Sequence, residues 1–227
     1  MKNVTLVAVG TIGVMAGAAT AAFTGLKLER WVGDGWLDNG YGDTGLITFR
    51  VWANFDGEGD DGVLAVFGID GVPMSANSPD GLFSNSQPGL DSLTAPLDLR
   101  FLGIWEAQWD TYVTINAESA DGDATGLSPG FGDATNNLAS NWSTENAGWF
   151  VTPDDEQSRA REKPNGGLGV LLGQFSVENQ GGPSGDVFLT LNLLLRDGSQ
   201  LEGLAFPAPG ALALLVPACL TGRRRRE

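Results

Sequence analysis

The chain has 227 residues, of which 28 are acidic and 13 basic, so its formal net charge is −15. An acidic surface of this kind repels nucleic acids and anionic membranes and favours divalent cations. The sequence contains no histidine, which excludes Ser-His-Asp and Cys-His catalysis, histidine-ligated zinc and imidazole acid–base chemistry. The composition therefore restricts any active site to other side chains.

The N-terminus has the pattern of a secretory signal. Residues 1–3 supply one positive charge, and residues 4–19 are apolar and uncharged. The small residues at positions 19–22 fit a signal-peptidase site. We expect residues 1–22 to be removed during export, so that the mature chain begins near Phe23.

The mature chain, residues 23–206, has a length that suits a single domain with a full-sized core. It holds eight of the 13 basic residues and 27 of the 28 acidic ones, which gives a net charge of −19. It contains no cysteine, because Cys219 lies beyond it. An exported domain without disulfides must depend on its core or on bound metal.

The periodicity along the mature chain is that of strands. Residues 26–32 and 46–55 alternate apolar with polar side chains, and residues 63–69 form a continuous apolar run that predicts a strand buried on both faces or a strand of an inner sheet. Further strands are expected over residues 99–104, 109–117, 168–177, 186–195 and 200–205.

Turn-forming residues separate these strands. Residues 71–98 and 118–146 are rich in Pro, Gly, Asp, Asn and Ser and are expected to be long loops. A short helical turn is expected around residues 154–161, and Asp197-Gly198 favours a hairpin turn over residues 196–199. No amphipathic helix of ten residues or more is indicated. The sequence therefore predicts an all-β fold, an antiparallel β-sandwich with jelly-roll-like connections and long Gly/Asp/Pro-rich loops.

Two short motifs resemble catalytic or nucleotide-binding patterns. Residues 126–130 fit G-x-S-x-G, but Pro129 lacks the backbone N–H that an oxyanion hole needs after the serine, so a Pro-Gly turn is expected. Residues 57–62 fit G-x-G-x-x-G, but their three carboxylates would repel a pyrophosphate and no helix follows. An acidic turn between two strands is expected there.

That acidic turn is also the candidate calcium site. Asp56, Glu58 and Asp60 alternate like the first ligands of an EF-hand loop. Asp61 replaces the glycine that an EF-hand requires, and Phe67 replaces its bidentate glutamate, which excludes an EF-hand. An irregular site between loops stays open, as does the alternative that these are solvated turn residues. Such a site would draw on further carboxylates from Asp121, Asp123 or Asp133.

The seven tryptophans raise the alternative of glycan binding, because exposed aromatic rings stack on sugar faces. Trp52, Trp105 and Trp149 lie in or beside predicted strands and are expected in the core. Trp36 and Trp142 lie in polar segments and are the candidate glycan contacts. Adjacent carboxylates over residues 154–156 could serve a glycosidase, but beside arginines they are typical of a solvated, locally paired patch.

The C-terminus combines a proline-rich motif, a short apolar run over residues 211–220 and a basic cluster. The ten-residue run would span about 15 Å as a helix, half of a bilayer core. This order resembles the PEP-CTERM sorting tail of exported bacterial proteins that exosortases process, in a Pro-Ala-Pro variant where Ala208 replaces the usual glutamate. The sorting residues are Pro207, Ala208, Pro209, Arg223, Arg224, Arg225 and Arg226.

Three interior stretches also resemble exported planctomycete-type proteins with such tails. They are DGVLAVFGIDG at residues 61–71, WDTYVTINAESADGDAT at residues 109–125 and AGWFVTPDDEQ at residues 147–157. The resemblance implies an exported compartment and a β-rich fold, and it carries no catalytic or cofactor-binding residue.

These observations favour a non-enzymatic β-sandwich at the cell surface or in the extracellular matrix, sorted through residues 207–227. The implied partners are signal peptidase, an exosortase-type enzyme and exopolysaccharide; contact with the membrane is expected only transiently through the termini, and none with nucleic acid. The alternatives are a carbohydrate-binding module and, third, a glycan-cleaving enzyme. Calcium is the one cofactor that the sequence suggests.

Overall fold

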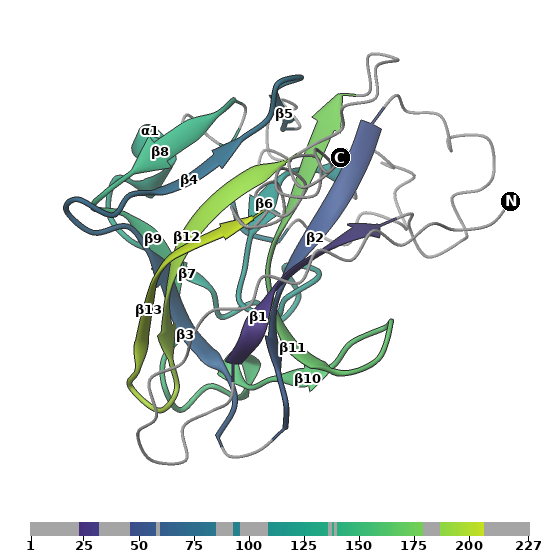
Figure 1. The fold of residues 1–227 in the computed structure, drawn as a ribbon, viewed down its shortest axis with the longest axis vertical. Helices are drawn as coiled ribbons and strands as arrows, with labels where there is room; N and C mark the ends of the chain where they lie inside the picture. Colours follow the sequence, from purple (N-terminus) through teal and green to yellow (C-terminus); the bar gives the residue numbers. More distant parts are fainter. Residues whose placement is uncertain are drawn as a thin grey trace, which may run out of the picture.

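A computed structural model of the chain describes residues 23–31, 46–57, 60–84, 93–95, 109–135, 138, 140–178 and 187–206. Within these residues the chain is almost entirely β-structure, arranged as two antiparallel sheets (Figure 1). The helical parts whose full extent lies within the described residues include α1 (Phe131–Ala134) and the 3-10 helix η4 (Glu156–Ser158). None of the helices in the described part is long and apolar enough to cross a membrane.

The first sheet is built around β2 (Leu46–Phe55), which pairs with β1 (Phe23–Trp31) on one side and β11 (Leu168–Glu178) on the other. The far edge of β11 is covered in turn by three two-residue strands. These are β10 (Arg161–Glu162), β6 (Tyr112–Val113) and β5 (Leu82–Phe83). The two long inner strands of this sheet are therefore β2 and β11, and β11 pairs with the larger number of strands.

The second sheet is built around β12 (Phe188–Leu195). It pairs with β13 (Gln200–Phe206) on one side and with β3 (Val63–Phe67) and then β4 (Met74–Asn77) on the other. Beyond them lie β9 (Gly148–Phe150) and β8 (Trp142–Thr144), and β7 (Gly126–Leu127) pairs with β9 at the edge.

The strands β3 and β4 follow one another along β12, separated by a turn that leaves the sheet at residues 68–73. Asn192 of β12, which is fully buried, closes this interruption. Its amide donates to the carbonyls of Phe67 and Val72 at 2.8 and 2.9 Å, and its carbonyl oxygen accepts from the Gly203 N–H at 2.7 Å. One buried amide thus hydrogen-bonds to backbone groups of β3, of the turn and of β13, and holds the three segments together.

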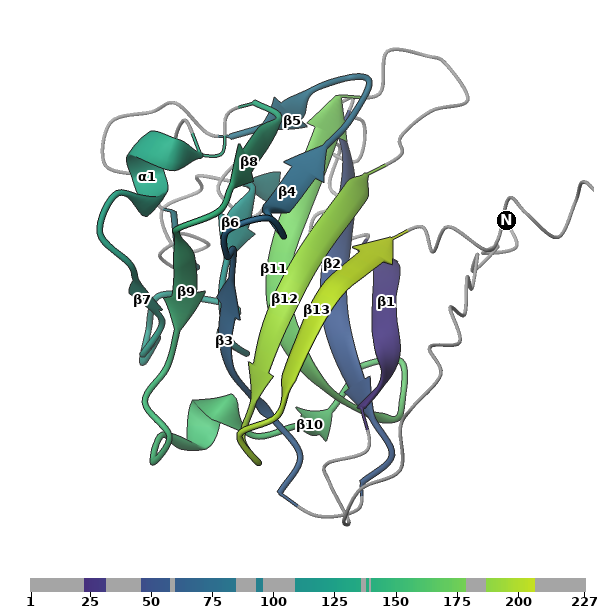
Figure 2. The ribbon, with the colours of Figure 1, turned by 60° about the vertical axis from the view of Figure 1, so that its left-hand side comes forward.

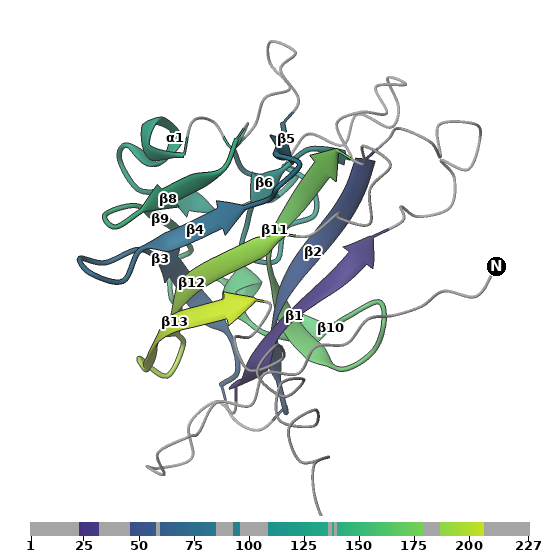
Figure 3. The same ribbon diagram turned by 45° about the horizontal axis from the view of Figure 1, so that its top comes forward.

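The two sheets lie face to face, with β12 and β13 in front of β11 and β2 in Figure 2. Their inward side chains form one apolar core, which includes Val51, Val66, Trp149, Phe175 and Leu193. At one open side the edge strands β1 and β13 contact each other (Figure 3). The all-β sandwich predicted from the sequence is confirmed, and its jelly-roll connections stay a prediction.

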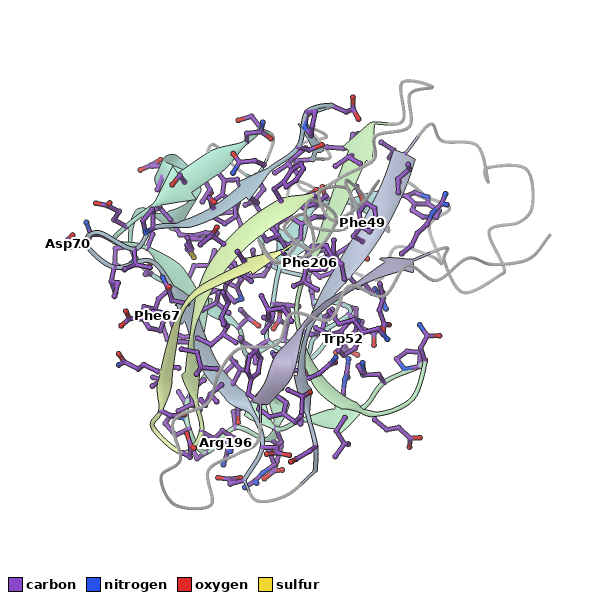
Figure 4. All side chains as sticks on the ribbon, in the orientation of Figure 1. Phe49, Trp52, Phe67, Asp70, Arg196 and Phe206 are labelled. Atoms are coloured by element: carbon purple, nitrogen blue, oxygen red, sulfur yellow. The ribbon has the colours of Figure 1, made fainter. Side chains whose placement is uncertain are left out.

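The outer face of the first sheet is also largely buried. Along β2, Val51, Ala53 and Phe55 point into the core, so Arg50 and Trp52 point outward. Trp52 is nevertheless only 1% exposed and lies on the side of β2 away from β13 (Figure 4). Loops cover this face, and polar side chains lie beneath them.

Several details of the sequence-based expectation were wrong. In β3, Val63 and Val66 are fully buried, whereas Leu64, Ala65 and Phe67 are half-buried, so this strand is not buried on both faces, although it does lie inside a sheet, between β12 and β9. The strands β4 and β5 lie in the expected loop 71–98, and β8 lies in the expected loop 118–146. The expected strand 99–104 lies outside the described residues.

Candidate functional site

A polar pocket of about 610 Å³ opens at the end of the sandwich where η4 and β10 meet the loop after β6. Residues 116–122 form one wall and residues 156–161 the other. The two walls are far apart in sequence, and Asn116 joins them: its amide donates to the carbonyls of Gln157 and Arg159 at 2.8 and 2.6 Å.

The conformation of Asn116 makes this connection possible. Its φ is 65°, in the left-handed region that asparagine tolerates better than most residues. Its side-chain oxygen accepts from the Leu171 N–H at 2.9 Å, and its backbone N–H donates to the Leu171 carbonyl at 2.8 Å. Asn116 is 4% exposed, so one buried amide ties the pocket loop, η4 and the central strand β11 together.

Glu118 is the charged centre of the loop wall. Its carboxylate accepts from buried Arg50 at 2.7 Å through one oxygen and from Arg161 at 2.8 Å through the other. Arg50 also donates to Gln174 at 3.3 Å.

Tyr112 lies near this group of charges. Burial raises the pKa of its phenol to about 12, although the positive charge of Arg50 by itself would lower that pKa. The phenol is therefore neutral at physiological pH.

On the opposite wall, Arg159 pairs with Asp60 and, at 3.0 Å, with Glu156. Asp60 also accepts from Arg196 at 3.0 Å. The hydrogen bond from Arg196, helped by the charges of both arginines, lowers the pKa of Asp60 below its ordinary 3.8. Arg196 lies at the β12–β13 turn (Figure 4), so these pairs connect the pocket wall to the second sheet.

Gln157 joins its wall of the pocket to residues 123–125. Its amide donates to Asp123 at 2.9 Å and to Thr125 at 3.0 Å, and its oxygen accepts from the Ala124 N–H at 2.9 Å. The pocket is thus lined with amide, carboxylate and guanidinium groups held in fixed positions. Such a surface can bind a polar ligand through several directional hydrogen bonds.

Two of the three predicted calcium ligands, Asp56 and Asp60, lie within the described residues. Asp56 is exposed, Asp60 is engaged by two arginines, and Glu58 lies outside the described residues. Two guanidinium groups beside Asp60 would repel a cation at the same carboxylate. Among the described residues no group of three carboxylate, cysteine or histidine side chains is placed to hold a metal ion. Calcium binding stays a prediction.

The other three acidic candidates are all described by the structure. Asp121 is exposed at the pocket rim and Asp133 is exposed on α1, while Asp123 accepts from Gln157 and from the Thr125 N–H at 2.8 Å.

The expectation that Trp142 is exposed was wrong. Trp142 is 4% exposed and packs edge-on against Phe131 of α1, with ring centroids 6.1 Å apart. It is not available to stack on a sugar, because β8 turns it into the core. Trp149 lies in the core as expected. Trp52 is buried, but on the outer face of the first sheet and not in the core between the sheets, and Trp36 and Trp105 lie outside the described residues.

The short motifs have structural roles. Ser128 lies before a turn at residues 129–130, as expected, and its hydroxyl accepts from the Gly148 N–H at 2.8 Å. In the acidic turn the Gly57 N–H donates to Asp61 at 2.9 Å. Asp155 caps η4 by accepting from the Gln157 N–H at 2.8 Å, which confirms the helical turn expected there. Of the three adjacent carboxylates, Glu156 pairs with Arg159 at 3.0 Å.

The signal and sorting residues, 1–22 and 207–227, lie outside the described residues. Comparisons with protein-family models, with curated proteins and with solved structures found no match. The functional argument for this chain therefore depends on its own residues and on the geometry of the pocket.

Proposed function

We propose that this chain is a non-enzymatic exported protein of the cell surface or extracellular matrix. Signal peptidase would release residues 1–22, and an exosortase-type enzyme would process the tail at residues 207–227. The supporting observation is the extent of the sandwich: its first strand begins at Phe23 and its last ends at Phe206. These are the limits of the mature chain between signal and tail.

Intact-mass measurement of the protein from its native host tests this proposal. The expected mature species begins near Ala22 or Phe23 and ends near Pro209. A species that keeps Arg223 to Arg226 would contradict processing of the tail. A species that keeps residues 1–22 would contradict removal of the signal.

Glycan binding in the pocket is the second candidate function. It is favoured by the pairing of the lining charges: Glu118 pairs with Arg50 and Arg161, and Arg159 pairs with Asp60 and Glu156. Paired charges offer donors and acceptors together, which matches the hydroxyl groups of a neutral sugar. We place a carbohydrate ligand here and no longer at Trp142.

A glycan array probed with the exported chain tests this second function. The variant Arg161→Gln should weaken any binding by about tenfold, since it removes a charge-assisted donor at the rim. Arg30→Gln changes an exposed arginine that does not line the pocket and serves as the matched control. Equal loss in both variants, or no binding by the unmodified chain, would remove the carbohydrate function and leave the structural one.

A further inference from the structure

A buried lysine contacts a side-chain amide on the outer face of the first sheet. Lys163 lies in the turn between β10 and β11, where its N–H donates to the Gly167 carbonyl and its carbonyl accepts from the Gly166 N–H, both at 2.9 Å. This turn lies beside β1 (Figure 3). The Lys163 side chain is 3% exposed, and its Nζ lies 2.7 Å from Oδ1 of Asn54 on β2.

The strands leave space for this contact. Asn54 is paired with Gly25 of β1 on one side and with Gly169 of β11 on the other. At Gly169 a Cβ atom would stand 2.9 Å from Lys163 Cδ and 3.4 Å from Asn54 Oδ1. The glycine therefore lets the lysine stem cross β11 and reach the amide.

A carboxylate completes the cluster. Glu29 of β1 is 7% exposed, and its Oε1 lies 3.5 Å from Lys163 Nζ. Lys27 at 2.6 Å and the Asn165 amide at 3.0 Å hold the same carboxylate. Burial alone would raise the pKa of Glu29, but these partners lower it below its ordinary 4.5, so the group is an ionised proton acceptor. Burial lowers the pKa of the Lys163 ammonium, which favours the nucleophilic amine.

We propose that Lys163 Nζ and Asn54 Cγ join in an intramolecular isopeptide bond, with Glu29 as the proton acceptor. The Nζ–Cγ bond forms and the Cγ–Nδ2 bond breaks. One of the three ammonium protons of Lys163 stays on the new amide. The other two leave with Nδ2 and its hydrogens as an ammonium ion, one of them by way of Glu29. No oxidant or further reactant is needed.

In water an amine attacks an amide extremely slowly, and here the fold holds the two groups next to each other. Cγ is bonded to the oxygen that Nζ contacts at 2.7 Å, and a C=O bond is about 1.2 Å long, so Nζ lies within about 4 Å of the carbon that it would attack. A positioned pair of this kind can reach effective concentrations of roughly 10⁵ M or more. Lys163 and Glu29 are buried, and Trp52, which lies between Arg50 and Asn54 on β2, is only 1% exposed. The bond would link β2 to the β10–β11 turn across 109 residues of a mature chain without cysteine.

Mass spectrometry of the purified full chain tests the proposal directly. The denatured protein should weigh about 17 Da, the mass of ammonia, less than the mass calculated from the residues that the purified chain contains. Trypsin should release residues 51–100 and 162–196 as one linked species, because cleavage does not occur between Lys163 and Pro164. Recovery of these as two separate peptides at full mass would overturn the proposal. A loss confined to one peptide, as a succinimide at Asn165-Gly166 would give, would also overturn it.

Variants locate the reacting groups. Lys163→Arg and Asn54→Ala should each restore the full mass, whereas Lys27→Arg, which changes the other lysine at Glu29, should keep the loss. Glu29→Gln should leave freshly purified chain at least tenfold less linked. If Glu29→Gln links as fully as the unmodified chain, the assignment of Glu29 fails. If Lys163→Arg keeps the linked peptide, the bond itself is wrongly assigned.

Discussion

Asn116 shows how much one polar side chain can hold in this protein. Its amide satisfies three backbone groups, two in residues 157–159 and one on β11, at the cost of a left-handed backbone. A strained residue of this kind persists where its surroundings fix it. The pocket walls therefore depend on a residue that is itself almost inaccessible.

Replacing Asn116 should separate strain from hydrogen bonding. Asn116→Ala loses all three side-chain hydrogen bonds and keeps the strained φ, so we expect a loss of about 3 kcal/mol in the free energy of unfolding. Asn116→Gly loses the same bonds but tolerates the backbone, and it should be less destabilised than Ala by roughly 1 kcal/mol. Urea unfolding measures both. Equal effects would show that the backbone conformation costs nothing.

Asp60 should contribute to a pH-dependent stability. Its pKa is lower in the folded state than its ordinary 3.8, so the unfolded chain binds more protons as the pH falls. The contribution is present above pH 3.8 and is lost as the pH falls through the folded pKa. We expect Asp60→Asn to have a lower Tm than the unmodified chain at pH 7, with the gap closing in acid.

The control for this experiment is Asp70→Asn. Asp70 lies exposed at the tip of the turn between β3 and β4 (Figure 4), away from Arg196. The Asp70→Asn substitution removes one negative charge, as Asp60→Asn does, but it breaks no ion pair with Arg159 or Arg196. A gap of equal size and pH dependence in both variants would show that net charge alone is responsible.

At the level of elements, alternation over long stretches predicted the structure well. The expected strand 46–55 coincides with β2, and 168–177 and 200–205 each fall one residue short of β11 and β13. These strands each have one apolar face against the core, so the period of two is visible in sequence. Strands of two to four residues, such as β4, β5 and β8, carry too few positions to show a period.

The site was harder to predict than the strands. The turn at residues 154–161 was expected, but its partners Asn116 and Glu118 lie some forty residues earlier in a segment rich in small polar residues. Nothing in the local sequence pairs Glu118 with Arg50 or Arg161, because sheet pairing brings them together. Trp142 was misjudged for a related reason: its polar neighbours Asn141 and Ser143 conceal a short inward-facing strand.

The contact between β3 and β9 should be intolerant of any side chain at Gly148. A Cβ there would stand 3.0 Å from Phe67 Cα and closer still to the Val66 carbonyl. Gly148→Ala should therefore cost about 2 to 4 kcal/mol, since two paired backbones must separate. Gly71→Ala, with φ of 79° and open space around it, should cost only about 1 kcal/mol. Chemical unfolding of the two variants would distinguish steric from conformational cost; equal losses would contradict the close approach.

For the whole molecule, the net charge of −19 on residues 23–206 should oppose compactness. Sodium chloride should raise the Tm continuously by screening this repulsion, without a saturable step. A flat response would show that the charges are already compensated. Calcium at equal ionic strength tests the remaining metal hypothesis: a further, saturating rise would support a site, and Asp56→Asn should then reduce it.

The two central strands, β11 and β12, both come from the last third of the chain. A polypeptide that emerges N-terminus first can form the β1–β2 pair early, but neither sheet acquires its middle until residues 168–195 have appeared. Until then β2 lacks its neighbour β11 and β3 lacks its neighbour β12. Folding of the sandwich before that point is therefore disfavoured, and the chain stays extended. This order of strands would suit the export that we propose, because an export channel admits only an extended polypeptide. The sandwich could then close only after most of the chain had crossed the membrane.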